Sequence, residues 1–493
     1  MEHSTEKSDD RRDGHRQQEL EVSPSLSCLL TLPLGESVST FSLENAVCSH
    51  GLFMMAPNQW DPSTKTFQRP LRLSDETTSI LVRISHPPNS PSLHVRVLGT
   101  AFLSPDDQRV LLAQVTRMLR LSDSDERNIR EFHKIHHEAK ERGFGRVFRS
   151  PTLFEDMVKC ILLCNCQWPR TLAMAKALFE LQSDLKCNSL GCSDSQGSSL
   201  DSRCSKAKYE DFFPKTPIGR DSKKRRAVHK ISLNLDSKFK KAENELEADV
   251  YGKTNSDHPT QCLQLKEKIS ATLASPLEGD ESQEHCCYNK QLCTKVKVDA
   301  NPALDLQFSE DKVSGTNGKI GNFPNPREIA GLNEALLAKR CNLGYRASRI
   351  LKLAQSIVQG KLQLRELEED CNGESSSLYA MLFNKFREID GFGPFTCANV
   401  LMCMGFYEMI PVDSETIRHL KQVHARQSTI QSVHRDVEKI YGGYAPFQFL
   451  AYWSELWHFY GARFGKLSEM LPSEYHLITA SNMRTKRTNK KNI

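Results

Sequence analysis

The amino-acid sequence predicts an α+β protein with a mainly helical body, an antiparallel β-sheet before it and a long disordered insertion within it. Three observations lead to this expectation: alternating apolar residues before residue 100, helical periodicity after Ser104, and a long polar tract in the middle of the chain. The 493 residues include 38% hydrophobic ones, enough for two or three domains. The mean hydropathy of −0.51 indicates that part of the chain is too polar to enter a core.

The first ordered part is expected to be a β-rich N-terminal domain at residues 25–105, after a disordered N-terminus at 1–24. Apolar residues alternate through 80–84 and again through 93–97, and the Pro- and Ser-rich segment 86–92 between them favours a turn. This pattern predicts an antiparallel hairpin.

Apolar residues recur at helical spacing from Ser104 onward, which predicts a helical domain whose first part covers residues 106–182. Residues 183–320 are rich in polar and charged residues and are expected to be a disordered insertion. Helical periodicity returns in 321–470, and a basic tail follows at 471–493.

A glycine hairpin is expected between two of the later helices. Gly391 and Gly393 can adopt a positive φ without a Cβ clash, and Pro394 suits the first position of a new helix. Free backbone N–H groups at such a turn can bind a phosphate. Taken alone, the pattern also fits an ordinary connection between helices.

Asp413 follows the apolar run 409–412 and precedes Ser-Glu-Thr-Ile-Arg, so it stands where a side chain caps the N-terminus of a helix. We expect its carboxylate to face the same rim as the hairpin. A capping role and a chemical role can hold together.

The hairpin and the aspartate resemble the signature of the helix-hairpin-helix DNA glycosylase superfamily (HhH-GPD), whose members excise bases from DNA. Residues 391–399 read Gly-Phe-Gly-Pro-Phe-Thr-Cys-Ala-Asn, and Asp413 follows Pro-Val. Three further segments are similar to the 8-oxoguanine DNA glycosylase branch: Leu-Gly-Tyr-Arg-Ala-Ser-Arg-Ile at 343–350, Cys-Asn-Cys-Gln-Trp-Pro-Arg at 164–170 and Tyr-Gly-Gly-Tyr-Ala-Pro-Phe at 441–447. The chain is identified as a member of the superfamily, closest to this branch. Because the resemblance stops before the insertion and resumes after it, the insertion is expected to be a tethered loop outside a single fold.

The resemblance implies a role for each matching residue. Asp413 matches the aspartate that stabilises an oxocarbenium-like sugar and orients the attacking water. Asn165 matches the residue that fills the space left by a flipped nucleotide. The remaining roles are donors to the orphan cytosine (Arg170 and Arg346), a wedge beside it (Tyr345), a DNA-backbone hairpin (Gly391, Phe392, Gly393, Phe395 and Thr396) and a base pocket (Gly51, Asn399, Phe447 and Gln448). Both arginines also suit phosphate contacts or solvated charges, and Tyr345 also suits the core.

Phe395 departs from the family pattern. Members that also cut the strand carry a lysine at this position, whose amine forms a Schiff base with the sugar, and a phenyl ring cannot do so. Lys385 and Lys421 are poorly placed to replace it. The position therefore favours a monofunctional glycosylase in which water is the nucleophile, with Phe395 stacking on a flipped base or packing the core.

Three functions remain open from the sequence. The first is a DNA N-glycosylase of base excision repair that hydrolyses the N-glycosidic bond of an oxidised or alkylated purine and leaves an abasic site. The second is a bifunctional 8-oxoguanine glycosylase/AP lyase that uses another amine. The third is a catalytically silent DNA-damage-binding protein, which an Asp413 that serves only as a helix cap would permit.

Charge and cysteine content set the expected partners and compartment. The basic run at 215–241 holds Lys223, Lys224, Arg225 and Arg226, which read as a nuclear localisation signal or a DNA-binding arm, or as a solvated run without a partner. The sixteen cysteines are scattered, as in a reducing compartment. We expect a nuclear monomer that binds damaged double-stranded DNA and cooperates with downstream repair enzymes, with no membrane span.

No metal site and no organic cofactor is expected. The group of His285, Cys286, Cys287 and Cys293 lacks paired Cys-x-x-Cys spacing. No cysteine follows Cys403, so an iron–sulfur loop beyond Asp413 is absent from the sequence. A monovalent cation at the hairpin is the one candidate ion.

Overall fold

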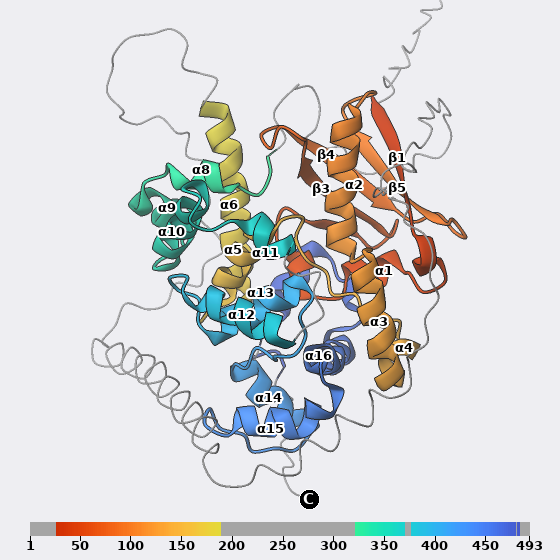
Figure 1. Cartoon of the computed structure of the whole chain (residues 1–493), viewed down its shortest axis with the longest axis vertical. Helices are drawn as coiled ribbons and strands as arrows, with labels where there is room; N and C mark the ends of the chain where they lie inside the picture. The colour runs from red at the N-terminus through yellow and green to blue at the C-terminus, as the bar shows by residue number, and fades with distance from the viewer. Residues whose placement is uncertain (1–25, 189–320, 370–375, 480, 484–493) are drawn as a thin grey trace, which may run out of the picture.

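The computed structural model describes residues 26–188, 321–369, 376–479 and 481–483, and it has the expected α+β architecture (Figure 1). The predicted disordered N-terminus, nearly all of the predicted insertion and the last ten residues lie outside these ranges. The proposed nuclear localisation signal and the His/Cys group near residue 290 therefore also lie outside the described residues.

One antiparallel five-stranded sheet forms the N-terminal layer, with the strand order β1-β5-β4-β3-β2. The predicted hairpin is confirmed, because β4 and β5 pair with Ile84 opposite Val95, and both side chains are fully buried. The strands are β1 (Ser27–Pro33), β2 (Gln59–Asp61), β3 (Thr66–Arg72), β4 (Ser79–Ser85) and β5 (Ser92–Leu98).

Strand β1 lies before the segment in which the sequence shows its clearest β pattern. Cys28, Leu30 and Leu32 are buried and alternate with more exposed residues, so one face of β1 enters the core. Its partner is β5, which is distant in sequence, and the pairing places the start of the described chain at the sheet edge.

Helices make up the rest of the described chain. The N-terminal 3₁₀ and α-helices are η1 (Gly35–Ser39), α1 (Leu43–Val47), η2 (Gly51–Met54), α2 (Pro105–Leu119), α3 (Asp123–Ile135), α4 (His137–Glu141), α5 (Leu153–Leu163) and α6 (Trp168–Asn188). The later ones are α8 (Pro326–Ala330), α9 (Glu334–Arg340), α10 (Arg346–Val358), α11 (Leu364–Glu369), α12 (Ser376–Arg387), α13 (Pro394–Met404), α14 (Ser414–Val423), α15 (Val433–Tyr441), η4 (Gly442–Tyr444), α16 (Gln448–Phe464), η5 (Leu467–Glu469) and η6 (Pro472–Leu477). None of the helices in the described ranges is long and apolar enough to cross a membrane.

Helix α13 lies in the middle of the helical body and packs against α5 and α12 (Figure 1). Every residue from Thr396 to Met404 is buried. Two arginines from the N-terminal half hold its C-terminal end, since Arg120 donates to the carbonyl of Met402 and Arg149 to that of Cys403, at 2.7 and 2.9 Å. Cationic donors at a helix C-terminus satisfy carbonyls that lack intrahelical partners.

The sheet and the helices share one hydrophobic core. Arg69 on β3 joins the sheet to the helices, because its guanidinium donates two hydrogen bonds to the carboxylate of Glu155 on α5, at 3.2 and 2.9 Å. Both side chains are buried. Burial acts to raise the pKa of Glu155, but Arg69 and the buried Lys159 outweigh it and lower that pKa to about 2. The N-terminal layer is therefore fused to the helical body through a buried ion pair.

Gln182 joins the two halves of the described chain. Helix α6 continues past residue 182, where the sequence predicts the start of the insertion, and ends at Asn188. The fully buried Gln182 side chain accepts a bond from the Asn322 N–H at 2.7 Å and donates to Glu328 at 2.8 Å. Asn322 and Glu328 therefore lie beside α6, the helix that ends at Asn188.

The hairpin before α13 uses one of its two glycines in the expected way. Gly391 has a φ of +88°, whereas Gly393 is an N-cap with φ −81° and ψ 176°, so the expectation of a positive φ is wrong for Gly393. Pro394 occupies the first turn of α13, as predicted. A Cβ on Gly391 would also overlap the side chain of Arg349, while a Cβ on Gly393 would meet nothing within 4 Å.

Replacing Gly391 with alanine should therefore lower the free energy of unfolding by about 1–2 kcal/mol, because an L-residue is strained at this φ. Gly393→Ala is the matched control and should change stability by less than about 0.5 kcal/mol. Chemical denaturation of both variants measures the difference. Equal losses would show that the positive φ is not the constraint on this hairpin.

Candidate functional site

The N-terminus of α13 presents unpaired backbone donors beside a cation. No side chain caps the helix, and within the described residues no acceptor pairs with the N–H of Phe395 or Thr396. The side chain of Arg349 on α10 lies against Gly391. Amide donors at a helix N-terminus next to a guanidinium make a suitable phosphate site.

The turn that carries Asn165 packs directly on this hairpin. Sγ of Cys164 lies 2.9 Å from Oγ1 of Thr396, which connects the end of α5 to the first turn of α13. Asn165 has a φ of +46° and an exposed side chain. An Asn in this left-handed conformation is held away from the regular helix, with its amide directed to solvent.

Arg346 lies beneath that turn. Only 2% of Arg346 is exposed, and its guanidinium donates to the carbonyls of Cys164 and Asn165, the latter at 3.2 Å. In this structure Arg346 therefore supports the backbone of the Asn165 turn, whereas the resemblance implies a direct contact with an orphan base. Its Nε is buried and has no hydrogen-bond partner among the described residues.

Tyr345 and Arg170 lie on the surface beside the turn. Tyr345 is 50% exposed, so the alternative that it packs in the core does not hold. The guanidinium groups of Arg346 and Arg349 lie over its ring, at 4.6 and 4.7 Å from the ring centre. Arg170 is exposed and donates to the Asn342 carbonyl at 3.2 Å. These residues and the hairpin form one continuous surface.

Asp413 is the N-cap of α14, as its position in the sequence predicts. Its Oδ1 accepts the N–H groups of Glu415 and Thr416, both at 2.9 Å, and lies 3.2 Å from Oγ1 of Thr416. All hydrogen bonds that its side chain accepts in the described part of the chain go to Oδ1, which leaves Oδ2 without a protein donor there. Asp413 is exposed at the surface of the molecule.

The surroundings of Asp413 disfavour its ionised form. Loss of hydration in the crowded protein surroundings of the carboxylate raises the pKa of Asp413 above its usual range, although hydrogen bonds from Thr416 and Glu415 lower it. A nearby positive charge would stabilise the ionised form of such a carboxylate.

A buried hydroxyl pair connects Asp413 to the last long helix. Oγ1 of Thr416 accepts the Asp413 N–H at 3.3 Å and lies 3.1 Å from the hydroxyl of Tyr452 on α16. Thr416 and Tyr452 are both buried. If Thr416 donates to Asp413, Tyr452 donates to Thr416, so the chain of hydrogen bonds orients the carboxylate from α16.

The segment around Gly51 lies on a neighbouring part of α16. The indoles of Trp453 and Trp457 donate to the carbonyls of Ser49 and Cys48, at 2.9 and 2.8 Å. The indole ring of Trp168 lies 3.2 Å from the place of a Cβ on Gly51. These two indoles of α16 therefore fix the backbone that precedes Gly51.

The other predicted pocket residues lie on α13 and at the start of α16. Asn399 is buried and donates to the Phe395 carbonyl at 2.8 Å, within α13. Phe447 is the buried N-cap of α16, and Oε1 of Gln448 is buried without a partner among the described residues. Phe395 itself is half-buried. No hydrogen bond between described residues connects this group directly to Asp413.

Sequence reasoning missed four contributors to this site: Cys164, Arg349, Thr416 and Tyr452. Arg349 and Cys164 stand inside the segments that resemble the glycosylase branch, so their place was visible but their role was not. Thr416 is the third residue after Asp413, which is the spacing of a capping box. Nothing in the sequence connects it to Tyr452, because that contact joins two helices.

No protein-family model matches the chain, and no curated protein matches its sequence. Among solved structures, the chain is similar to 3-methyladenine DNA glycosylase from Archaeoglobus fulgidus, with 12% identity, a TM-score of 0.42 and coverage of 88% of this chain and 98% of that one. It is also similar to the 8-oxoguanine glycosylase/lyase of Clostridium acetobutylicum in its apo form, with 10% identity, a TM-score of 0.42 and coverage of 85% and 93%. The same enzyme in complex with double-stranded DNA containing cytosine opposite 8-oxoG gives 10% identity, a TM-score of 0.40 and coverage of 85% and 92%. Similarity at this level transfers no residue role, substrate or mechanism to this chain.

The capping role of Asp413 can be tested with a pair of variants. Asp413→Ala removes the cap of α14 and should lower the free energy of unfolding by about 1 kcal/mol, whereas Asp413→Asn keeps a capping oxygen and should change it by only a few tenths. Thermal and chemical unfolding at neutral pH measure both. Equal destabilisation by the two variants would contradict the capping geometry.

Proposed function

We propose that the protein is a DNA N-glycosylase of base excision repair. It extrudes a damaged purine, oxidised or alkylated, from duplex DNA and hydrolyses the N-glycosidic bond to leave an abasic site. The observation that carries the proposal is the Asp413 carboxylate, whose Oδ1 is fixed by the first turn of α14 while Oδ2 has no donor among the described residues.

The chemistry of base release makes use of such a carboxylate. Departure of the base leaves positive charge on the sugar, and a fixed negative charge stabilises that transition state without reorganising. Oδ1 is held by three contacts, so the carboxylate cannot rotate away. Oδ2 is then available to accept a proton from the attacking water or to face the developing cation.

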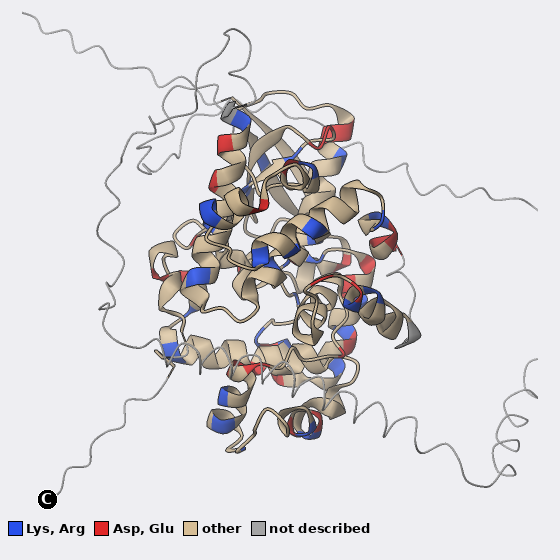
Figure 2. Ribbon diagram, turned by 90° about the vertical axis from the view of Figure 1, so that its left-hand side faces the viewer, with Lys and Arg blue, Asp and Glu red and all other residues tan. Residues whose placement is uncertain are grey.

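The DNA-facing surface supports the same proposal. The free N–H groups of α13 and Arg349 suit a backbone phosphate, as a positioning contact that carries no sequence information. The exposed Asn165 and Tyr345 stand side by side on rigid supports, as required of groups that replace a base removed from the stack. Basic and acidic residues are intermixed over the described body (Figure 2), so binding would depend on these placed groups more than on a basic field.

Phe395 supports a reaction that stops at the abasic site. It stands at the first turn of α13, half-buried, and has no nitrogen to form a Schiff base. Lys421 lies two turns along α14 from Asp413 and is exposed, and Lys385 is exposed on α12. We propose that water is the nucleophile.

The test is a panel of duplexes that carry 8-oxoguanine, alkylated purines, hypoxanthine or uracil, incubated with the full chain. Strand breaks that appear only after alkali are the expected result, with one purine lesion preferred. Borohydride trapping of a protein–DNA adduct would instead identify a lyase. Tight lesion binding with every base left intact would identify a damage-binding protein, for which the capping role of Asp413 alone is sufficient.

Asp413→Asn should lower the single-turnover excision rate by at least about 100-fold, because it removes the fixed charge and keeps the cap. The affinity for lesion DNA should change by less than about threefold, since phosphate and wedge contacts remain. Excision assays and gel-shift titrations with the same duplex measure the two quantities. Full activity of this variant would overturn the proposed role of the carboxylate.

The raised pKa of Asp413 predicts an acid limb in the pH–rate profile. The reaction needs the ionised carboxylate, so the rate should fall as the pH drops through a value above the usual range of aspartate. Folding stability depends on pH in the opposite direction. Because the pKa of Asp413 is raised in the folded state, its protonated carboxyl group stabilises the fold at low pH, and this contribution is lost as the pH rises through the folded pKa. A pH–rate profile under single-turnover conditions checks the limb, and an acid limb at or below the ordinary aspartate pKa would contradict it.

A further inference from the structure

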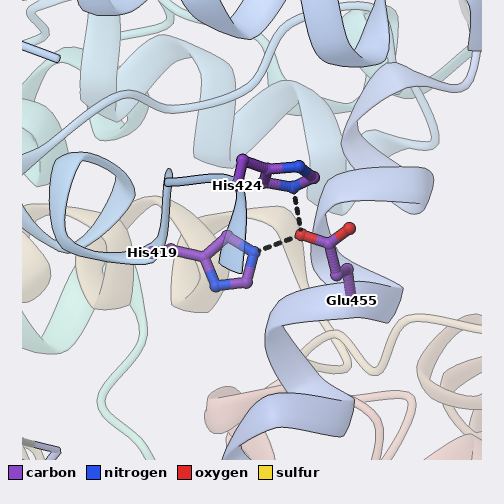
Figure 3. A group of neighbouring side chains, drawn as sticks. All are labelled: His419, His424 and Glu455. Carbon is purple, nitrogen blue, oxygen red and sulfur yellow. Dashed lines mark hydrogen bonds and ion pairs between the residues drawn. The ribbon is translucent and has the colours of Figure 1, made fainter. Parts of the chain in front are cut away.

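Two histidines and a glutamate meet where α14 packs on α16 (Figure 3). His419 lies on α14, His424 is the residue at its C-terminal end, and Glu455 lies on α16. Nε2 of His419 is 2.5 Å from Oε1 of Glu455, and Nε2 of His424 is 2.7 Å from the same oxygen. The three atoms lie within 4.8 Å of one another.

The cluster is closed on one side and open on the other. The side chain of His419 is fully buried, whereas those of His424 and Glu455 are 24% and 33% exposed. His419 is held among aromatic rings, including those of Tyr452 and Phe459. A small ion can therefore reach the cluster from solvent and meet ligands that packing has already oriented.

Glu455 has no permanent cation beside it. Within the described residues its ion-pair partners are His419 and His424, and neither Lys nor Arg is among them. The carboxylate is 33% exposed, so it lies half-buried beside two imidazoles.

The two carboxylate oxygens of Glu455 differ in their hydrogen bonds. Oε1 of Glu455 accepts from both Nε2 atoms and from the hydroxyl of Tyr441 at 2.8 Å, while Oε2 has no donor among the described residues. If His419 is neutral and its Nε2 donates, its Nδ1 carries the lone pair, and Nδ1 is buried without a partner among the described residues. A cation would accept the Nε2 lone pairs of both histidines and either oxygen of the carboxylate.

We propose that His419, His424 and Glu455 bind one divalent transition-metal ion, with zinc as the best match. Two imidazoles and one carboxylate are a zinc ligand set with bond lengths of about 2.0–2.2 Å, and they leave a fourth position for water. Ligand atoms around such an ion lie about 3.3 Å apart, so the Glu455 carboxylate must withdraw by about 1 Å. Its partial exposure allows this movement.

The metal site is independent of base excision and goes beyond it. It would fix the C-terminal end of α14 to α16, while Thr416 and Tyr452 fix the N-terminal end that carries Asp413. Tyr441 would hydrogen-bond the ligand carboxylate from outside the coordination sphere, a contact whose loss weakens metal binding by about 10–100-fold.

The test measures zinc bound to the purified full chain after removal of metal and equilibrium dialysis against zinc, followed by elemental analysis. Glu455→Gln and His424→Gln should each lose one equivalent of zinc per chain relative to the natural sequence. His458→Gln, which replaces an exposed histidine on the same helix, is the matched control and should lose none. Tyr441→Phe should retain the site with lower affinity.

The chain also has sixteen cysteines, and thiolates are common zinc ligands. The difference in zinc content between the variants therefore decides the result, and the total zinc content does not. Cobalt is a second probe, because substitution at a nitrogen and oxygen site gives visible absorption that should vanish in His424→Gln and persist in Asp413→Asn. Persistence in Asp413→Asn, a variant expected to lose excision, separates this site from the proposed function. Equal zinc content and equal cobalt spectra in the natural sequence and in folded His424→Gln would overturn the proposal, and His424→Gln decides if Glu455→Gln fails to fold.

Discussion

Every residue of α13 from Thr396 to Met404 is buried by the surrounding protein. Because these contacts are closely packed on every side, they fix both the position of the helix along its axis and its rotation about that axis. Arg120 and Arg149 fix its C-terminal end by bonding to two of its last carbonyls. Its N-terminal end is left without a side-chain cap, beside the hairpin. The packing of α13 therefore fixes the position of its first turn, where the N–H groups of Phe395 and Thr396 have no acceptor in the described part of the chain.

The remaining functional residues are placed by their attachment to this helix or to α16. The Asn165 turn is attached to α13 through Cys164 and Thr396, and Arg346 supports that turn from below. Asp413 is attached to α16 through Thr416 and Tyr452. A surface that would touch DNA and a carboxylate that would act on sugar are therefore held by different helices, and their separation is set by how α13 and α16 pack.

The sequence was informative wherever one residue decides the local backbone. The conformations of Gly391, Pro394 and Asp413 follow from the chemistry of turns, first helical positions and caps, and the hairpin of β4 and β5 follows from strict alternation. It was uninformative wherever a contact joins distant segments. Strand β1, the burial of Arg346 beneath the Asn165 turn and the bond between Thr416 and Tyr452 depend on tertiary packing, for which no local pattern exists.

The hydrogen bonds of Gln182 join the two described halves of the chain. Because Asn322 and Glu328 lie against the helix that ends at Asn188, the fold is continuous in space where it is interrupted in sequence. The junction between the two described halves is therefore built from residues of those halves themselves, with a buried amide on α6 and two polar partners in the later half.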